Sequence, residues 1–371
     1  MRRLLRGIVR VVLLLVTVIV AIPVLGLGYG FLTTEAPKSA PIVTHSPESA
    51  VISERLRVDL PGYKRTPEST FLTYPEWSIV YAAREYAGFV AEANPSGFPY
   101  FAYVGRFWQD YAAMIRASAA YPFNFQNHMM LMVIGISHTA EHVIQSVYEN
   151  TIGRLTSLAA DEVEEDRYQA KVAAEYAAFL DQVPWYQFPY RDKRIGLWTI
   201  PVADGAAAIR SSERKLGFGL AYAIKQSYAD LIRSGLSATS DPAALDIHVW
   251  ADGPVTDAIA GEPDTRLETD LGLNGAVFVT KRYQVFTDMI PRLIERGVRF
   301  VEIGGNQEIM LTVLSNEEVG LPDGTRKLFS YPLPTDAAEI RTGIAARVAD
   351  LHDILPELAN EGARLEHVYD Y

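Results

Sequence analysis

The chain has 371 residues, of which 49% are hydrophobic, so it is long enough for two domains and too apolar to be disordered throughout. It contains no cysteine, which excludes disulfides, thiolate catalysis, iron–sulfur clusters and cysteine-ligated zinc. Apart from four arginines near the N-terminus, 30 basic residues face 45 acidic ones, a formal charge of −15. A surface this acidic repels phosphate backbones, so we expect no nucleic-acid partner.

The N-terminus has the pattern of a membrane anchor. Arg2, Arg3, Arg6 and Arg10 lie in the first ten residues, and residues 11–32 then contain no charge. About 20 apolar residues cross a bilayer as a helix, and a basic flank stays in the cytoplasm. We therefore expect a cytoplasmic end at 1–10 and a single transmembrane anchor at 11–32. The rest would lie in the periplasm of a bacterial inner-membrane protein, and a cleaved signal peptide is the alternative.

Residues 33–70 are rich in Pro, Ser and Thr and predict a periplasmic tether, in which only Val51 to Leu60 has the character of a strand. Residues 71–238 predict a mainly α-helical domain. Its first helix should begin at Tyr74, because Thr73 and Glu76 have the spacing of a capping box. The other helices expected in this domain are Phe98–Ala119, a helix within 127–153, Asp161–Gln182 and Ala206–Gly235.

Residues 239–371 predict a smaller α+β domain with a mostly antiparallel sheet, so the fold class is α+β. The sequence is compatible with a core shared by the two domains. We expect no internal repeat, since no repeat of fixed period is evident. The expected strands are Ile247–Trp250, Ala276–Tyr283, Arg299–Ile303, Ile309–Leu314 and Lys327–Leu333. The expected helices are Phe286–Arg296 and Ala337–Leu355, the second introduced by Asp336 and Glu339 as a capping box.

The most informative stretch for chemistry is 127–153. Its first half is apolar on every face, and its second half places His138, Glu141, His142 and Glu149 along one helical stripe. Two histidines four residues apart can present both imidazoles to one metal ion, and a nearby carboxylate can activate a bound water. The stripe therefore predicts a candidate zinc site with His138, His142 and Glu149 as ligands and Glu141 as the catalytic base.

The segment HTAEH resembles the H-x-x-E-H zinc helix of the inverzincins over five residues. The resemblance implies zinc binding by His138 and His142 and a general-base role for Glu141. It also implies a distant glutamate as third ligand, for which Glu149 and Glu213 are the candidates.

Three functions follow from these patterns. The first is a metal-assisted hydrolase of the cell envelope. The second is a non-catalytic envelope protein that binds a protein partner through its aromatic helical domain. The third is a carrier of an apolar or lipid-like ligand, with the aromatic helices forming a pocket. Two further interpretations of the histidines are open. The first and simplest is an exposed or ordinarily hydrogen-bonded polar stripe, and the second is a buried polar pocket that binds or acts on a ligand without metal.

Overall fold

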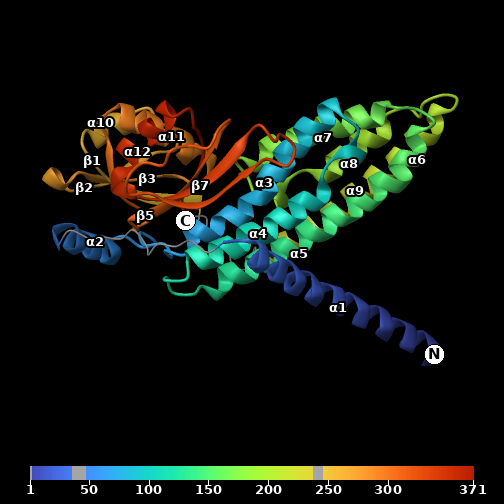
Figure 1. Cartoon of the computed structure of the whole chain (residues 1–371), viewed down its shortest axis with the longest axis horizontal. Coiled ribbons are helices and arrows are strands. Elements are labelled where there is room, and N and C mark those ends of the chain that lie inside the picture. The colour runs from blue at the N-terminus through green and yellow to red at the C-terminus, as the bar shows by residue number, and fades with distance from the viewer. Residues whose placement is uncertain (1, 36–46, 237–244) are drawn as a thin grey trace.

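The computed structural model describes residues 2–35, 47–236 and 245–371 (Figure 1). The elements of the helical part are α1 (Arg2–Thr33), α2 (Pro47–Asp59), α3 (Ser69–Glu92), η1 (Pro95–Gly97), α4 (Tyr100–Ala117), α5 (Phe125–Tyr148), η2 (Glu149–Gly153), α6 (Arg154–Ser157), α7 (Glu164–Leu180), η3 (Trp185–Gln187), α8 (Tyr190–Thr199) and α9 (Ala207–Leu236). The elements of the mixed part are β1 (Asp246–Asp252), α10 (Val255–Ile259), β2 (Arg266–Asp270), η5 (Gly272–Asn274), β3 (Ala276–Lys281), α11 (Gln284–Glu295), β4 (Arg299–Ile303), β5 (Glu308–Ser315), β6 (Arg326–Pro332), β7 (Ile340–Arg347), η6 (Val348–Asp350), α12 (Leu351–Asn360) and β8 (Arg364–Tyr369).

Two antiparallel four-stranded sheets form the mixed part, with strand orders β2-β3-β1-β4 and β6-β7-β5-β8. Side chains alternate between the faces of a strand, so each sheet can contribute to two cores. Val249 of β1 and Leu311 of β5 lie in the core that both sheets share with α10, α11 and α12. Their neighbours Trp250 and Met310 point the other way, into cores covered by α2 and by the helical part. The α+β class with antiparallel sheets is therefore confirmed.

The helical part packs directly on the second sheet. Met310, Leu328 and Tyr369 of this sheet share a core with residues of α3, α4 and α5. The start of α3 is fixed by Thr70, whose hydroxyl donates to the Tyr369 carbonyl (2.6 Å) and accepts from the Met310 amide (2.9 Å). One continuous core thus joins the two expected domains, and the boundary expected near residue 238 lies outside the described residues.

Residues 51–59 are not a strand but belong to helix α2, which ends just before Leu60, and this part of the expected tether is integral to the fold. Leu56 and Tyr63 pack on Trp250 of the first sheet. Ser53 and Tyr63 donate to a carboxylate oxygen of buried Glu302, at 3.0 and 2.8 Å. Because Glu302 would otherwise be a buried acceptor without partners, these two hydrogen bonds anchor the segment after the N-terminal helix to the sheet.

Two capping-box predictions were wrong. Helix α3 begins at Ser69 and not at Tyr74, so Thr73 is buried inside it. The helix expected at 337–355 is instead strand β7 followed by α12, and Glu339 makes a backbone hydrogen bond to Leu333 across a turn. Strands β4 and β5 are joined by a tight turn in which Gly304 and Gly305 both have positive φ.

The helical part contains an internal duplication, so the expectation of no repeat was wrong. The segments Glu85–Ala87 and Phe98–Tyr100 recur 90 residues later as Glu175–Ala177 and Phe188–Tyr190. In both copies a helix is followed by a short 3₁₀ turn and a second helix, and the same rings meet. Tyr86 and Phe98 are 5.1 Å apart at 87°, and Tyr176 and Phe188 are 5.0 Å apart at 75°. Helices α3–α4–α5 and α7–α8–α9 are therefore two copies of one unit.

Helix α1 runs along α4 and projects beyond the bundle toward its N-terminus (Figure 1). Most side chains of the expected cytoplasmic end and of the first part of the expected anchor lie outside the described residues. Within the portion that is described, no helix combines the length and the apolar character needed to traverse a bilayer.

Candidate functional site

His138 and His142 lie one turn apart on α5 with their ring centroids 4.0 Å apart, as their spacing predicts. His142 Nδ1 is 3.0 Å from the His138 carbonyl oxygen, and since a carbonyl only accepts, this nitrogen carries the proton. The ring of His138 hydrogen-bonds to the backbone of Tyr103, and its buried Nε2 has no hydrogen-bond partner in the structure. Both imidazoles are thus oriented by backbone groups, and histidines that bind metals are commonly oriented by such hydrogen bonds.

The surroundings of the two rings favour their neutral forms. Burial, with a contribution from His142, holds the pKa of His138 well below its ordinary value. Burial also lowers the pKa of His142, although Glu141 and the His138 carbonyl oppose this shift. The pair therefore carries ring nitrogens able to accept a proton or a metal ion at neutral pH.

Glu141, the expected base, is directed toward α9. Its carboxylate is 2.6 Å from Lys225 Nζ and accepts a hydrogen bond from Gln145 at 3.2 Å. Burial would raise its pKa, but Lys225 and then His142 outweigh burial and hold the pKa of Glu141 below its ordinary value. Glu141 is therefore an ion-paired carboxylate that links α5 to α9.

Neither candidate for the third metal ligand is free. Both oxygens of Glu149 accept from Arg214, at 2.8 and 2.9 Å, inside a buried network that includes Asp166. Glu213 accepts from Thr156 at 2.9 Å and from Tyr148. Across the described ranges, no three metal-ligating side chains converge. The structure thus brings His138 and His142 together and commits the expected carboxylates to ion pairs and hydrogen bonds.

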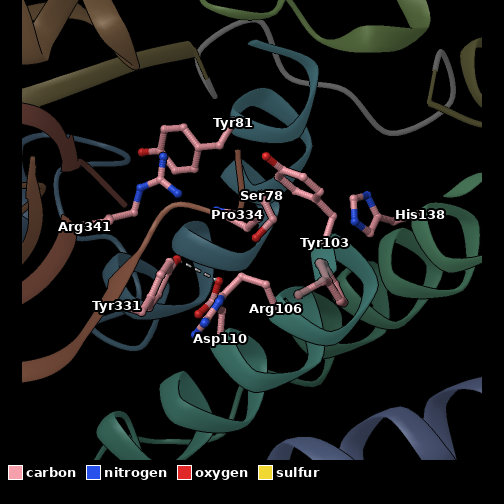
Figure 2. A pocket seen from close by; sticks show the side chains of 10 residues that line it. Ser78, Tyr81, Tyr103, Arg106, Asp110, His138, Tyr331, Pro334 and Arg341 are labelled. Carbon is pink, nitrogen blue, oxygen red and sulfur yellow. Dashed lines mark hydrogen bonds between the residues drawn. The ribbon is translucent and has the colours of Figure 1, made fainter. Parts of the chain in front are cut away.

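His138 also borders a small cavity between the helical part and the second sheet (Figure 2). The other polar groups around it come from α3, α4, β6 and β7, and include Tyr81, Tyr103, Arg106, Asp110, Tyr331 and Arg341. The space holds about one water molecule, so it is a hydration site rather than a pocket for a substrate.

Asp110 is the most perturbed acid at this cavity, and no motif in the sequence points to it. The Arg106 guanidinium lies 3.5 Å from the centre of the Tyr331 ring, and the Tyr331 hydroxyl donates to Asp110 at 3.3 Å. Burial raises the pKa of Asp110 to about 7, although Arg106 and Arg341 oppose the shift. In the sequence, Arg106 and Asp110 are four positions apart in a helix rich in aromatic residues. This spacing of opposite charges was the signal that could have pointed to a buried charged site.

The raised pKa of Asp110 leads to a prediction about stability. The unfolded chain loses the Asp110 proton near the ordinary aspartate pKa of 3.8, whereas the folded chain holds it to about 7, so stability falls as pH rises through this window. Asp110→Asn removes this dependence. We expect the variant to be more stable than the native protein at pH 8, by roughly 1 to 3 kcal/mol, and not at pH 4. Chemical unfolding at both pH values measures it, and an equal effect at both would contradict the assignment.

The aromatic helices form a packed core rather than a closed ligand chamber. Phe98 stacks on Tyr103 at 4.8 Å, and Phe107 and Trp108 meet edge to face at 5.2 Å. An open groove lies between the start of α4 and the end of α5, lined by Phe98, Tyr100, Phe101 and Val147 among others. Many of the aromatic rings thus serve as core, and this open groove is the feature of the described residues that supports the carrier hypothesis.

The largest unexplained feature is an apolar surface on α5 and α9. The exposed side chains of α5 are Phe125, Gln126, Met129, Met130, Val133, Ile144 and Val147, and those of α9 as far as residue 227 are Ile209, Ser212, Leu216, Leu220, Ala221, Ile224 and Ser227. None of these is charged. The charges of α9 in this range point inward, since Arg210, Arg214 and Lys215 are buried. We call this surface the α5–α9 face.

The α5–α9 face presents ten large apolar side chains among its fourteen exposed ones, and clustered exposed apolar side chains mark contact sites for a partner or a membrane. It covers about 27 Å along α9, at 1.5 Å per residue, close to the thickness of bilayer hydrocarbon of about 30 Å. In contrast, the exposed side chains of α7 include Glu164, Arg167 and Lys171. The exposed side chains of α5 and of this part of α9 are therefore uncharged, whereas those of α7 include several charges.

Comparison with family models, with curated proteins and with solved structures finds no match for this chain.

Proposed function

We propose that the protein is a non-catalytic envelope protein, anchored in the inner membrane by residues 11–32, whose helical part rests on the bilayer through the α5–α9 face. The single observation that carries this proposal is that the exposed side chains of α5, and those of α9 from Ile209 to Ser227, carry no charge, although α9 contains buried charged residues in this range. Charged groups are costly in hydrocarbon and favourable in water, so this segregation is what contact with lipid requires.

The position of α1 supports the same orientation. Its exposed side chains include Val24, Leu25 and Leu32, and it contacts α5 as well as α4. An apolar helix that leaves the bundle beside α5 would bring the α5–α9 face to the membrane. The acidic bulk of the chain would then lie away from anionic headgroups, on the periplasmic side.

The hydrolase is the weaker candidate. A catalytic zinc site uses three protein ligands and an open position, and here His138 and His142 supply two. Glu141 and Glu149 are held by Lys225 and Arg214.

Spin labels test the bilayer contact directly, because the chain has no cysteine and each introduced thiol is unique. Ile224→Cys on the α5–α9 face and Ala174→Cys on α7 replace two exposed side chains. In proteoliposomes of the full chain, we expect a label at 224 to collide mainly with oxygen, which concentrates in lipid. A label at 174 should collide mainly with a water-soluble nickel complex. Similar access of the nickel complex to both labels would refute the proposal.

A further inference from the structure

The two copies of the helical unit differ in what covers them: α1 packs on the first copy, whereas in the described residues no helix takes the equivalent place on the second. Trp108 of α4 and Trp198 of α8 occupy equivalent places, 90 residues apart. A Cβ at Gly135 of α5 would meet Phe107 and Trp108, and a Cβ at Gly219 of α9 would lie 3.2 Å from Trp198. Each tryptophan thus packs on a glycine of the following long helix. Yet Trp108 is 2% exposed and Trp198 is 53% exposed.

Helix α1 accounts for the burial of Trp108. A Cβ at Gly26 would overlap the Trp108 indole, and one at Gly30 would overlap its backbone, so the two glycines allow the helices to approach closely. Tyr29 lies over Gly105, and Gln109 Nε2 donates to Thr33 Oγ1 at 3.0 Å. The first copy therefore provides a binding surface for an apolar helix whose small residues are four positions apart.

The corresponding strip of the second copy is open. The positions equivalent to Gly105 and Trp108 are Ile195 and Trp198, and both side chains are exposed. Val202, in the loop that follows the end of α8, is exposed as well. On the next helix, Leu216 and Leu220 are exposed, whereas Met132 and Ile136, their counterparts 84 residues earlier on α5, are half-buried. We call these five residues, Ile195, Trp198, Val202, Leu216 and Leu220, the α8–α9 strip.

We propose that the α8–α9 strip binds an apolar helix of a partner membrane protein, one that presents small residues four apart to Trp198 as α1 presents Gly26 and Gly30 to Trp108. The inference rests on the proposed function, because such helices are available only in the bilayer. Lipid chains alone would not need the packing of tryptophan on glycine that the two copies share. The strip also differs from its counterpart in a specific way: Ile195 stands where Gly105 receives Tyr29, so the partner helix must be small at that point.

A cysteine pair tests the inference in the full chain, where α1 already occupies the binding surface of the first copy. The probe is a synthetic peptide of residues 11–34 carrying Thr33→Cys, reconstituted in nanodiscs with the Thr199→Cys protein. Thr199 is the counterpart of Gln109, so the pair copies the contact between Gln109 and Thr33. Lys171→Cys, on the charged side of α7, is the matched control.

We expect disulfide formation at 199 to exceed that at 171 by about tenfold, and to fall by about tenfold when the peptide also carries Gly26→Leu and Gly30→Leu. Adding Ile195→Gly to the protein should increase it, because Tyr29 of the peptide can then seat as it does on Gly105. Two results would overturn the inference. The first is equal cross-linking of the peptides with glycine and with leucine at positions 26 and 30. The second is disulfide formation between two copies of the Thr199→Cys protein without peptide. If cross-linking is lost while the label at 224 still contacts lipid, the strip faces lipid only and the proposed function stands. If cross-linking and the lipid contact of the label at 224 are both lost, the partner-helix inference and the proposed function both fail.

Discussion

Arg214→Leu lowers the free energy of unfolding by about 3 to 5 kcal/mol, the largest loss we expect from a single charged residue in the helical part. Arg214 is fully buried, holds both oxygens of Glu149 and lies 2.9 Å from Asp166. Leucine fills part of the space but leaves the Glu149 carboxylate in a low-dielectric interior without its cation, whereas Asp166 keeps Arg210. Urea unfolding of the purified full chain, followed by circular dichroism, measures the loss.

Arg167→Leu is the matched control, because Arg167 pairs with Glu162 and Glu164 on the exposed side of α7. Ion pairs exposed to solvent contribute little to stability, so this variant should unfold nearly as the native protein does. The double variant Arg214→Leu with Glu149→Gln should recover part of the loss, since the unpaired Glu149 charge is gone. A loss that is the same in the single and double variants would place the effect in packing rather than in charge.

Local patterns in the sequence predicted the elements whose signals are regular. The strand at Arg299–Ile303 was located to the residue, and Ala206–Gly235 differs from α9 by one residue at each end. The errors arose where a cap motif stood inside another element. Residues 337–355 contain alanines and an Asp-x-x-Glu spacing, but β7 pairs with β5 and β6 along its length. That pairing depends on strands far away in the sequence, which no window of the chain contains.

The candidate site shows the same limit. The helical spacing of His138 and His142 was sufficient to predict that their rings meet. It could not show that Glu141 and Glu149 turn to Lys225 and Arg214, because these partners come from α9, more than 60 residues later. The α5–α9 face could not be predicted from the sequence for a related reason. The sequence of α9 has the pattern of a charged, solvent-exposed helix, and only its packing against neighbouring helices buries those charges.

The two tryptophans give the sharpest comparison that the duplication allows. Trp108→Ala should lower the free energy of unfolding by about 3 to 5 kcal/mol, the usual cost of emptying a buried tryptophan site. Trp108 contacts α1, α5 and the ring of Phe107, and its Nε1 donates to Thr139 at 3.0 Å. All of these contacts are lost together.

Trp198→Ala makes the same chemical change at the equivalent place of the second copy, where half of the side chain is exposed, and should cost about 1 kcal/mol or less in detergent. Chemical unfolding of both variants under one set of conditions gives the difference, which reports what α1 contributes in the first copy. Equal losses would mean that Trp198 is already covered in the isolated protein, for instance by a second copy of the chain. In that case the strip would be an existing interface, and the proposed partner helix would have no place to bind.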